Sequence, residues 1–273
     1  MKNYYPKIGM REMCDNDILF NKSHVESVKN IMNTIGFRMK HDDTGHDLCF
    51  IKEPVLNFEM HTELFGLGHS QTMNNYYNNV FERLVKNDDS FQYSFTNEDF
   101  YIYITAHEYK HFSHGGTGLR NLVDRYVFLN HFSDDLDMSY IEAELSKIDI
   151  LDYEKNSRDL ALKLFNGIKL DAEEKQFLDY YIFSGTYGTT ENLVENGIKA
   201  SGGGITSRIR YGLDRFTVPV SRDNPSYKAY EAQYPFFYKH KLFLPLLPFY
   251  RLIHSLKKSR RRIITEIRTL MKI

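Results

Sequence analysis

The chain has 273 residues, with 42% hydrophobic residues, 26% charged residues and a formal net charge of -1, as expected for a globular protein. Its two cysteines, Cys14 and Cys49, exclude a disulfide framework and a cysteine-based zinc site. The longest apolar stretch, residues 242–250, is interrupted by two prolines and is too short to span a bilayer. No signal peptide is recognisable in residues 1–6, so the cytoplasm is the expected location.

The first chemically informative segment is Asp15-Asn16-Asp17, which leads into an apolar strand expected at Ile18–Phe20. Successive residues of a strand point to opposite faces, so Asp15 and Asp17 share one face. Two adjacent carboxylates repel each other unless a positive charge lies between them. Mg²⁺ commonly supplies that charge, although a solvated turn can carry the same residues.

Further along, we expect a helix from Ser23 to Ile35 and a strand at Leu56–His61. Alternation places Asn57, Glu59 and His61 on one face of that strand and Phe58 and Met60 on the other. If this strand neighbours the first, Glu59 becomes a third carboxylate beside the two aspartates. Three acids on adjacent strands suit a metal site for phosphoryl-type transfer. The alternative is a half-exposed strand with ordinary polar residues facing solvent.

The rest of the chain reads as mainly helical. A helix is expected at residues 71–86, and from Asn97 onward nearly every segment has helical periodicity. We therefore predict an α+β domain at residues 1–95, a helical domain at residues 96–238 and a basic amphipathic tail at residues 239–273.

The segment around residues 107–124 allows two interpretations. His107-Glu108-x-x-His111 matches the zinc-hydrolase pattern, in which both histidines bind the metal and the glutamate acts as general base. The competing interpretation uses Lys110, a cation suited to a triphosphate, and a pair formed by Arg120 and Asp124 on one helical face.

Three blocks of residues together resemble one known family. The blocks are Tyr5-Pro6 through Arg11-x-Met13-x-Asp15-x-Asp17-Ile18-Leu19, then Phe58-Glu59-Met60-His61, and then Lys110-His111-Phe112 with Gly116-Thr117-Gly118-Leu119-Arg120-x-Leu122-Val123-Asp124. Their order and spacing resemble the uncharacterised nucleotidyltransferase family of the polymerase-beta-like superfamily. The last block is the most specific of the three.

This resemblance implies a nucleotidyltransferase-type mixed β-sheet with flanking helices, followed by an α-helical domain. It implies Mg²⁺-dependent transfer of a nucleotidyl group from an NTP to an unknown acceptor, with release of pyrophosphate. The implied catalytic and metal-binding residues are Asp15, Asp17 and Glu59. The implied nucleotide-binding residues are Arg11, Lys110 and Arg120, and the implied structural supports are His61, His111 and Asp124.

The chain departs from the family pattern in two places. The family has a helix and a phosphate-gripping turn before the Asp-x-Asp strand, whereas only Met1–Met10 precede Arg11, so this element is expected to be absent. Cys14 and Asn16 stand where glycine and an aliphatic residue are more usual. The alternative to an enzyme is therefore a catalytically inactive nucleotide- or partner-binding protein of the same fold.

The C-terminal tail has an unusual charge. Residues 239–273 hold ten lysines and arginines and one acid, for a net charge of +9, against -10 for the rest. Within residues 251–272, apolar residues recur at helical spacing around a dense basic cluster. Such a helix suits an anionic membrane surface or RNA phosphates, and it would make the protein membrane-peripheral in the first case. The alternative is a helix docked on the body with a solvated basic face.

Overall fold

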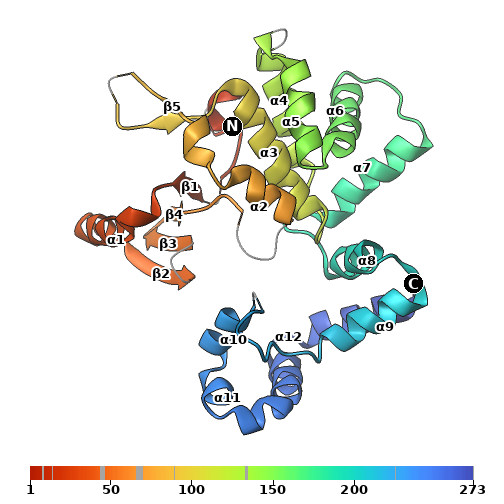
Figure 1. The fold of residues 1–273 in the computed structure, drawn as a ribbon. Helices are drawn as coiled ribbons and strands as arrows, with labels where there is room; N and C mark the ends of the chain where they lie inside the picture. The colour runs from red at the N-terminus through yellow and green to blue at the C-terminus, as the bar shows by residue number, and fades with distance from the viewer. Residues whose placement is uncertain are drawn as a thin grey trace. The chain divides into compact units, whose positions relative to one another are not determined.

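A computed structural model of the protein describes residues 1–7, 9–13, 15–43, 47–65, 70–88, 90–132, 135–224 and 226–272. It has the mixed α and β architecture expected from the sequence, with a small mixed sheet near the N-terminus and helices through most of the remainder (Figure 1). A short 3₁₀ helix, η1, covers Lys2–Tyr4 ahead of the sheet.

The sheet has four strands in the order β1-β4-β3-β2. Their bounds are Asn16–Leu19 for β1, Arg38–Asp43 for β2, Asp47–Lys52 for β3 and Leu56–His61 for β4. β1 pairs with β4 in parallel, whereas β4 with β3 and β3 with β2 are antiparallel. The connection that returns the chain from β1 to the sheet runs through helix α1, Val25–Thr34.

Helix α1 covers one face of the sheet and leaves the other face available for polar residues. Met32 of α1 packs with Leu48, Phe50 and Met60 in a buried cluster. Because side chains alternate along a strand, the residues between these core positions must point to the opposite face. Asn21 caps the 3₁₀ helix η2, Lys22–His24, which precedes α1. The helix expected from Ser23 to Ile35 therefore begins as a 3₁₀ turn and continues as α1.

The helix expected at residues 71–86 is shorter in the structure. Helix α2 covers Gln71–Tyr77, a 3₁₀ helix η3 covers Val80–Arg83, and Val85–Lys86 forms strand β5, which pairs with β6, Tyr93–Ser94. Four asparagines lie in this region, and asparagine side chains compete for backbone hydrogen bonds and favour turns over helix. The apolar periodicity therefore continued beyond the end of the helix itself.

The remaining elements are helical. Their bounds are α3 Asn97–Phe112, α4 Arg120–Phe132, α5 Met138–Lys147, α6 Leu151–Phe165, α7 Ala172–Ser184, α8 Thr190–Ala200, α9 Gly204–Asp214, α10 Tyr227–Gln233, α11 Pro235–Lys239, η5 Lys241–Leu246 and α12 Leu247–Lys272. A capping box formed by Asp171 and Glu174 begins α7. Ser259 has a non-helical backbone conformation that divides α12 into two parts.

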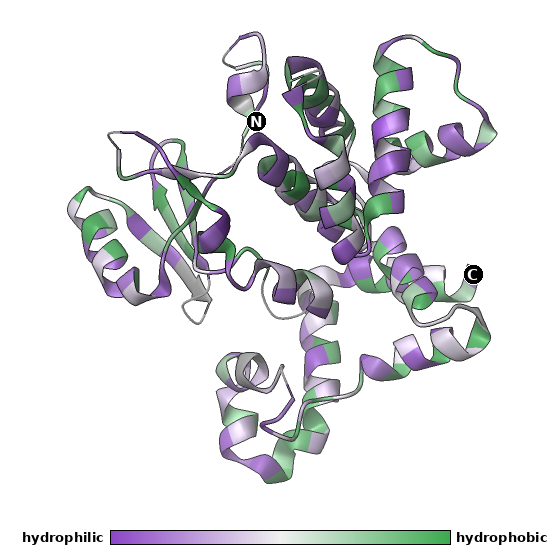
Figure 2. Cartoon of the chain, turned by 45° about the horizontal axis from the view of Figure 1, so that its top comes forward, coloured by the Kyte–Doolittle hydropathy of each residue, from purple (hydrophilic) through white to green (hydrophobic). Residues whose placement is uncertain are grey.

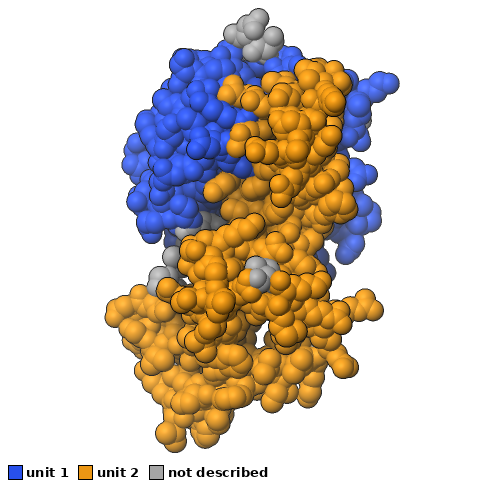
Figure 3. Space-filling view, turned by 90° about the vertical axis from the view of Figure 1, so that its right-hand side faces the viewer, with its two compact units in different colours: residues 1–106, 124–155 blue, residues 107–123, 156–273 orange. Residues whose placement is uncertain are grey.

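The chain forms two compact units, shown in separate colours in Figure 3. Unit 1 consists of residues 1–106 and 124–155, and unit 2 consists of residues 107–123 and 156–273. Helices α3 and α4 therefore contribute residues to both units. The division of the chain at residues 95 and 238 that we expect from the sequence stays a prediction.

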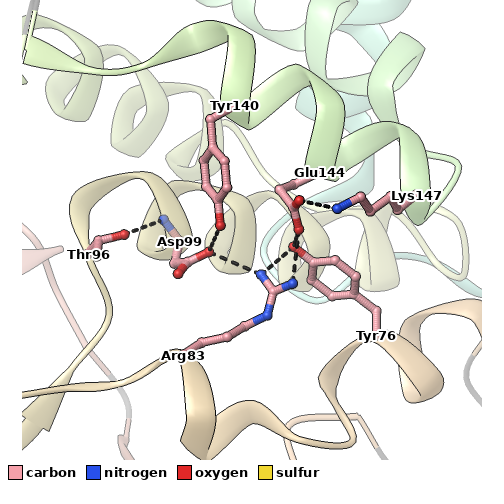
Figure 4. A network of polar contacts seen from close by, with 7 residues as sticks. All are labelled: Tyr76, Arg83, Thr96, Asp99, Tyr140, Glu144 and Lys147. Atoms are coloured by element: carbon pink, nitrogen blue, oxygen red, sulfur yellow. Dashed lines mark hydrogen bonds and ion pairs between the residues drawn. The ribbon is translucent and has the colours of Figure 1, made fainter.

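A polar network ties together four helical elements of unit 1 (Figure 4). Arg83 of η3 donates hydrogen bonds to Asp99 of α3 at 3.1 Å and to Glu144 of α5 at 2.9 Å. Tyr76 of α2 also donates to Glu144, at 2.6 Å, and Tyr140 donates to Asp99, at 3.0 Å. Asp99 and Glu144 are both buried, so the arginine compensates charges that water does not reach.

Unit 2 has a small aromatic cluster near its C-terminal end. Tyr227, Tyr238, Leu244 and Leu247 are buried together, and this packing joins α10, α11, η5 and the start of α12. Among the described residues, no helix combines the length and the apolar character needed to cross a membrane.

Candidate metal centre and nucleotide site

The pairing of β1 with β4 brings together the two acidic segments singled out in the sequence. In the parallel register, Asp17 lies directly opposite Glu59, and Leu19 lies opposite His61. The core side chains Phe58 and Met60 point toward α1, so Glu59 and His61 are on the other face. The two strands are therefore neighbours, which is the condition under which the sequence made Glu59 a third carboxylate beside the two aspartates.

Asp17, Glu59 and His61 form a group that could hold a metal ion. One ligand atom from each residue lies within 4.8 Å of the others. In the part of the chain that the structure describes, this is the one group of three or more acidic, histidine or cysteine side chains with such geometry. The sequence assigned His61 to structural support, and the structure brings it close enough to be a ligand.

His61 lies between two carboxylates. Its Nε2 is 3.0 Å from Asp17 Oδ1, and its Nδ1 is 2.6 Å from Asp47 Oδ1. Burial alone would lower the pKa of His61, but the hydrogen bonds to Asp17 and Asp47 outweigh burial and raise the pKa to about 9. The ring is therefore protonated at neutral pH and offsets part of the negative charge of this face.

Sequence reasoning missed Asp47. This residue begins β3 and lies opposite His61 in the antiparallel register of β3 and β4. The signal was available, because residues 47–51 and 56–61 each have the pattern of a strand, and the short connection between them predicts a hairpin. Alternation across such a hairpin would have placed Asp47 on the same face as His61.

The carboxylates of this face repel each other. Burial, followed by the nearby charges of Asp15 and Asp17, raises the pKa of Glu59. Asp15 directly precedes β1, and it acts on Glu59 without belonging to the metal-capable group described above. A cation bound on this face would reverse the effect and favour the carboxylate form of Glu59.

Arg11 and Asp124 form a two-pronged ion pair within unit 1. Arg11 Nε donates to Asp124 Oδ1 at 2.9 Å, and Arg11 Nη2 donates to Asp124 Oδ2 at 2.7 Å. The Tyr5 hydroxyl donates to the same carboxylate at 2.6 Å. The sequence suggested Arg120 as the partner of Asp124; the structure gives it two partners from the segment that leads into β1.

The remaining predicted residues lie in unit 2. Arg120, at the start of α4, lines a pocket of about 240 Å³ together with Thr117, Asn121, Tyr181 and Gly185. This pocket combines a cationic side chain, hydroxyl and amide groups, and backbone at a helix N-terminus, which are groups that bind anions.

Lys110 and His111 occupy the last turn of α3, which also belongs to unit 2. Burial lowers the pKa of His111, and the neighbouring charges of Lys110 and His114 lower it further. His111 is nonetheless exposed to solvent, and its supporting role stays a prediction.

A comparison with known protein families gives a match over the first part of the chain. The family model described as uncharacterised nucleotidyltransferase matches residues 1–166. The chain belongs to this family. No curated protein and no solved structure was found to match the chain. The matched residues include β1, β4, the end of α3 and the start of α4, and thus every residue that the sequence singled out as a site residue.

The structure also shows the surroundings of the His107-Glu108-x-x-His111 string, which the sequence left open as a zinc-hydrolase pattern. Glu108 is buried, with 6% of its surface exposed, and its Oε1 accepts a hydrogen bond from Tyr181 at 2.9 Å. The rings of His107 and His111 lie 4.9 Å apart, but these residues do not appear in a metal-capable group within the described chain. Glu108 thus has a packing role between α3 and α7 within unit 2.

Proposed function

We propose that the protein transfers a nucleotidyl group from an NTP to an acceptor hydroxyl or phosphate in a Mg²⁺-dependent reaction. Membership of the nucleotidyltransferase family supports the class of reaction. The observation that carries the proposal is the pairing of Asp17 with Glu59 across two parallel strands, beside Asp15 and His61. In this reaction the acceptor oxygen bonds to the α-phosphorus, the bond to the β-phosphate breaks, pyrophosphate leaves and the acceptor gives up one proton.

The donor set of the cluster fits a hard divalent cation. Asp17 and Glu59 offer carboxylate oxygens, which Mg²⁺ prefers, and Asp15 adds a third negative charge nearby. His61 is protonated at neutral pH, so the oxygens are the ligands available without release of a proton. Bound Mg²⁺ would neutralise charge on the phosphates and on departing pyrophosphate.

The protein's own side chains would position the reactants. Asp15 and Asp17 would hold the cation, and Glu59 would complete its coordination or accept the proton of the acceptor hydroxyl. Lys110 and Arg120 would contact phosphates, as the family resemblance implies. Arg11 donates hydrogen bonds from Nε and Nη2 to the two carboxylate oxygens of Asp124. Because these donors are already engaged, we assign Arg11 a role in positioning the segment before β1 and not in contacting the nucleotide.

Calorimetry with NTPs tests the proposal, in Mg²⁺ and in EDTA, alongside an assay of pyrophosphate release. Asp17→Asn removes charge at the ligand and keeps the shape of the side chain. We expect it to weaken Mg²⁺-dependent NTP binding by at least about tenfold, the loss typical of disturbing a metal site, with the fold retained. Glu82→Gln is the matched control, because Glu82 is an exposed carboxylate of unit 1 far along the chain from the cluster.

The outcomes separate the alternatives. If Asp17→Asn leaves Mg²⁺-dependent turnover unchanged, the assignment of the metal site to Asp17 is wrong. Binding that requires Asp17 without any pyrophosphate release, across the four common NTPs and a set of acceptors, would favour the nucleotide-binding protein of the same fold. Stoichiometric zinc in the purified protein, lost in His107→Ala, would revive the zinc-hydrolase alternative.

A further inference from the structure

A row of exposed apolar side chains runs from η5 into the first part of α12. Leu246, Phe249, Ile253 and Leu256 are 54%, 59%, 57% and 42% exposed. Their spacing of three and four residues places them along one side of a helix. Leu242, at 88% exposed, precedes the row in η5. We call these five residues the apolar row.

The apolar row is separate from the packing that holds this helix in place. On the other side of α12, Leu247 is fully buried against Tyr238 and Leu244. Arg251 lies over the ring of Tyr230, with its guanidinium carbon 4.9 Å from the ring centroid. The helix thus has an inner side, which is already packed, and an outer side, which carries the apolar row. Figure 2 colours the chain by hydropathy and shows hydrophobic and hydrophilic residues mixed along its helices.

Positive charge borders the apolar row. Lys239 and Lys241 precede it, and exposed Lys257, Arg260 and Arg261 follow it. Glu266 is the one acid within residues 239–273, and it accepts a hydrogen bond from Arg215, the residue that follows α9. The excess of nine positive charges in this region therefore meets little compensation within its own segment.

The second part of α12 fixes the first part to unit 2. Helix α12 packs against α8, and in its part beyond Ser259 the side chain of Thr269 is buried and Glu266 pairs with Arg215. The change of direction at Ser259 separates this docked part from the part that carries the apolar row. The part of α12 before Ser259 is therefore attached to unit 2 at both ends, and its apolar row remains exposed to solvent.

We propose that the apolar row and its flanking lysines and arginines bind the surface of an anionic lipid bilayer. An interfacial helix buries a narrow apolar side among acyl chains while basic residues contact headgroups, and this segment has both features. The inference goes beyond the proposed nucleotidyl transfer and does not depend on it.

Two other occupants fit the face less well. A second copy of the chain related by a two-fold axis would bring the same basic residues opposite each other, and like charges would repel. RNA would use the basic residues, but four of the five residues of the apolar row are aliphatic, and Phe249 alone in the row offers a ring for stacking on bases. A bilayer satisfies the aliphatic and the basic residues together.

Sedimentation of the full chain with vesicles tests the proposal. The vesicles contain phosphatidylcholine alone or an equal mixture of phosphatidylcholine and phosphatidylglycerol. We expect binding to the anionic vesicles that falls as salt is raised, and little binding to the neutral ones. Lys257→Gln with Arg261→Gln should reduce the partition coefficient by about 25-fold, or about fivefold for each charge.

Ile253→Ser with Leu256→Ser should reduce the partition coefficient by about tenfold or more, because less apolar surface enters the bilayer. The matched control is Ile31→Ser with Ile35→Ser, which removes two exposed aliphatic side chains near the end of α1, outside the basic region at residues 239–273. The control variant should sediment as the unchanged protein does. All variants replace exposed residues, and circular dichroism verifies that they remain folded.

Three results would overturn the proposal. The first is equal binding to neutral and anionic vesicles, or no binding to either. The second is a loss of binding in the control variant equal to that in Ile253→Ser with Leu256→Ser. The third is RNA binding or dimer formation that requires residues of this face while vesicles are not bound; light scattering and a gel shift with single-stranded RNA detect these cases.

Discussion

His61 brings positive charge into a group of carboxylates. At neutral pH the protonated ring contacts Asp17 through Nε2 and Asp47 through Nδ1, so it partly compensates two acids at once. A cation held by Asp17 and Glu59 would add positive charge beside the ring and would lower its pKa. His61 therefore links the charge of the proposed metal ligands to Asp47, a residue that does not itself belong to the metal-capable group.

A substitution at Arg11 can show whether this residue positions its neighbours or contacts the nucleotide. Its guanidinium grips both oxygens of Asp124, which is 7% exposed, and a lysine ammonium cannot reproduce this fork. Arg11→Lys should destabilise the protein by about 1–2 kcal/mol because the buried carboxylate loses part of its compensation. NTP affinity should stay within about twofold, because the nucleotide would not be contacted by this side chain.

Thermal unfolding and calorimetry measure the two effects of Arg11→Lys separately. Arg38→Lys, at an exposed arginine of β2, serves as the control for the exchange of side chains. A large loss of NTP affinity with unchanged stability would show instead that Arg11 binds the nucleotide directly, as the family resemblance implied.

At the scale of elements, the turn after α3 depends on glycine. Gly116 has a positive φ of +93°, and a Cβ added there would lie 2.1 Å from Ser184 Oγ and 2.6 Å from Ser184 Cβ. The neighbouring Gly115 carbonyl accepts a hydrogen bond from Thr189 N at 2.7 Å, so this turn packs closely against the residues that lead into α8. The Ser184 side chain therefore occupies the space that a Cβ at position 116 would need.

Gly116→Ala should destabilise unit 2 by about 3 kcal/mol, the sum of left-handed backbone strain and overpacking. Gly202→Ala is a matched control, because Gly202 has a φ of +96° but no atom within 4 Å of an added Cβ. The control should cost about 1 kcal/mol, from backbone strain alone. Urea unfolding measures both, and equal losses in the two variants would contradict the close packing at Gly116.

The elements also show how far sequence reasoning reaches. The strand at Leu56–His61 was predicted with its observed bounds, because alternation of Phe58 and Met60 with polar residues is a local signal. The helix at residues 71–86 was predicted too long, because its asparagines interrupt the helix without interrupting the apolar pattern.

Pairing between distant segments lies beyond local pattern. The approach of Arg11 to Asp124 depends on a contact across 113 residues of sequence. Periodicity assigned each segment to a strand or a helix, but it gave no register and no partner for these charges. For Asp17 and Glu59, the sequence supplied the residues and the structure supplied their juxtaposition.

At the scale of the whole molecule, a net charge of -1 conceals two opposed charge distributions. The acidic face of the small sheet suits a cation, and the basic region at residues 239–273 suits an anionic surface. Salt screens the exposed basic region strongly, whereas the half-buried groups around Glu59 are screened less. Raising the salt concentration should therefore weaken binding of an anionic surface to residues 239–273 more than it weakens binding of a cation near Glu59.

The stability of the whole molecule should depend on pH through the network around Arg83. Burial would raise the pKa of Glu144, but hydrogen bonds from Lys147, Tyr76 and Arg83 outweigh it and lower the pKa from 4.5 to about 2. A carboxyl with a lowered pKa in the folded state stabilises the fold above its ordinary pKa, and this contribution disappears as pH falls toward the folded pKa. The loss should therefore occur between about pH 4.5 and pH 2.

Glu144→Gln removes the charge at every pH and tests this dependence. At pH 7 the variant should be less stable than the unchanged protein by about 2 kcal/mol, and the difference should shrink as pH falls through this range. Glu82→Gln, at an exposed carboxylate of the same unit, should produce a difference below about 0.5 kcal/mol at either pH. Urea unfolding at several pH values measures the three proteins. A difference for Glu144→Gln that stays constant from pH 7 to pH 3 would contradict the argument, because only an ionised Glu144 gains from the positive charges of Arg83 and Lys147.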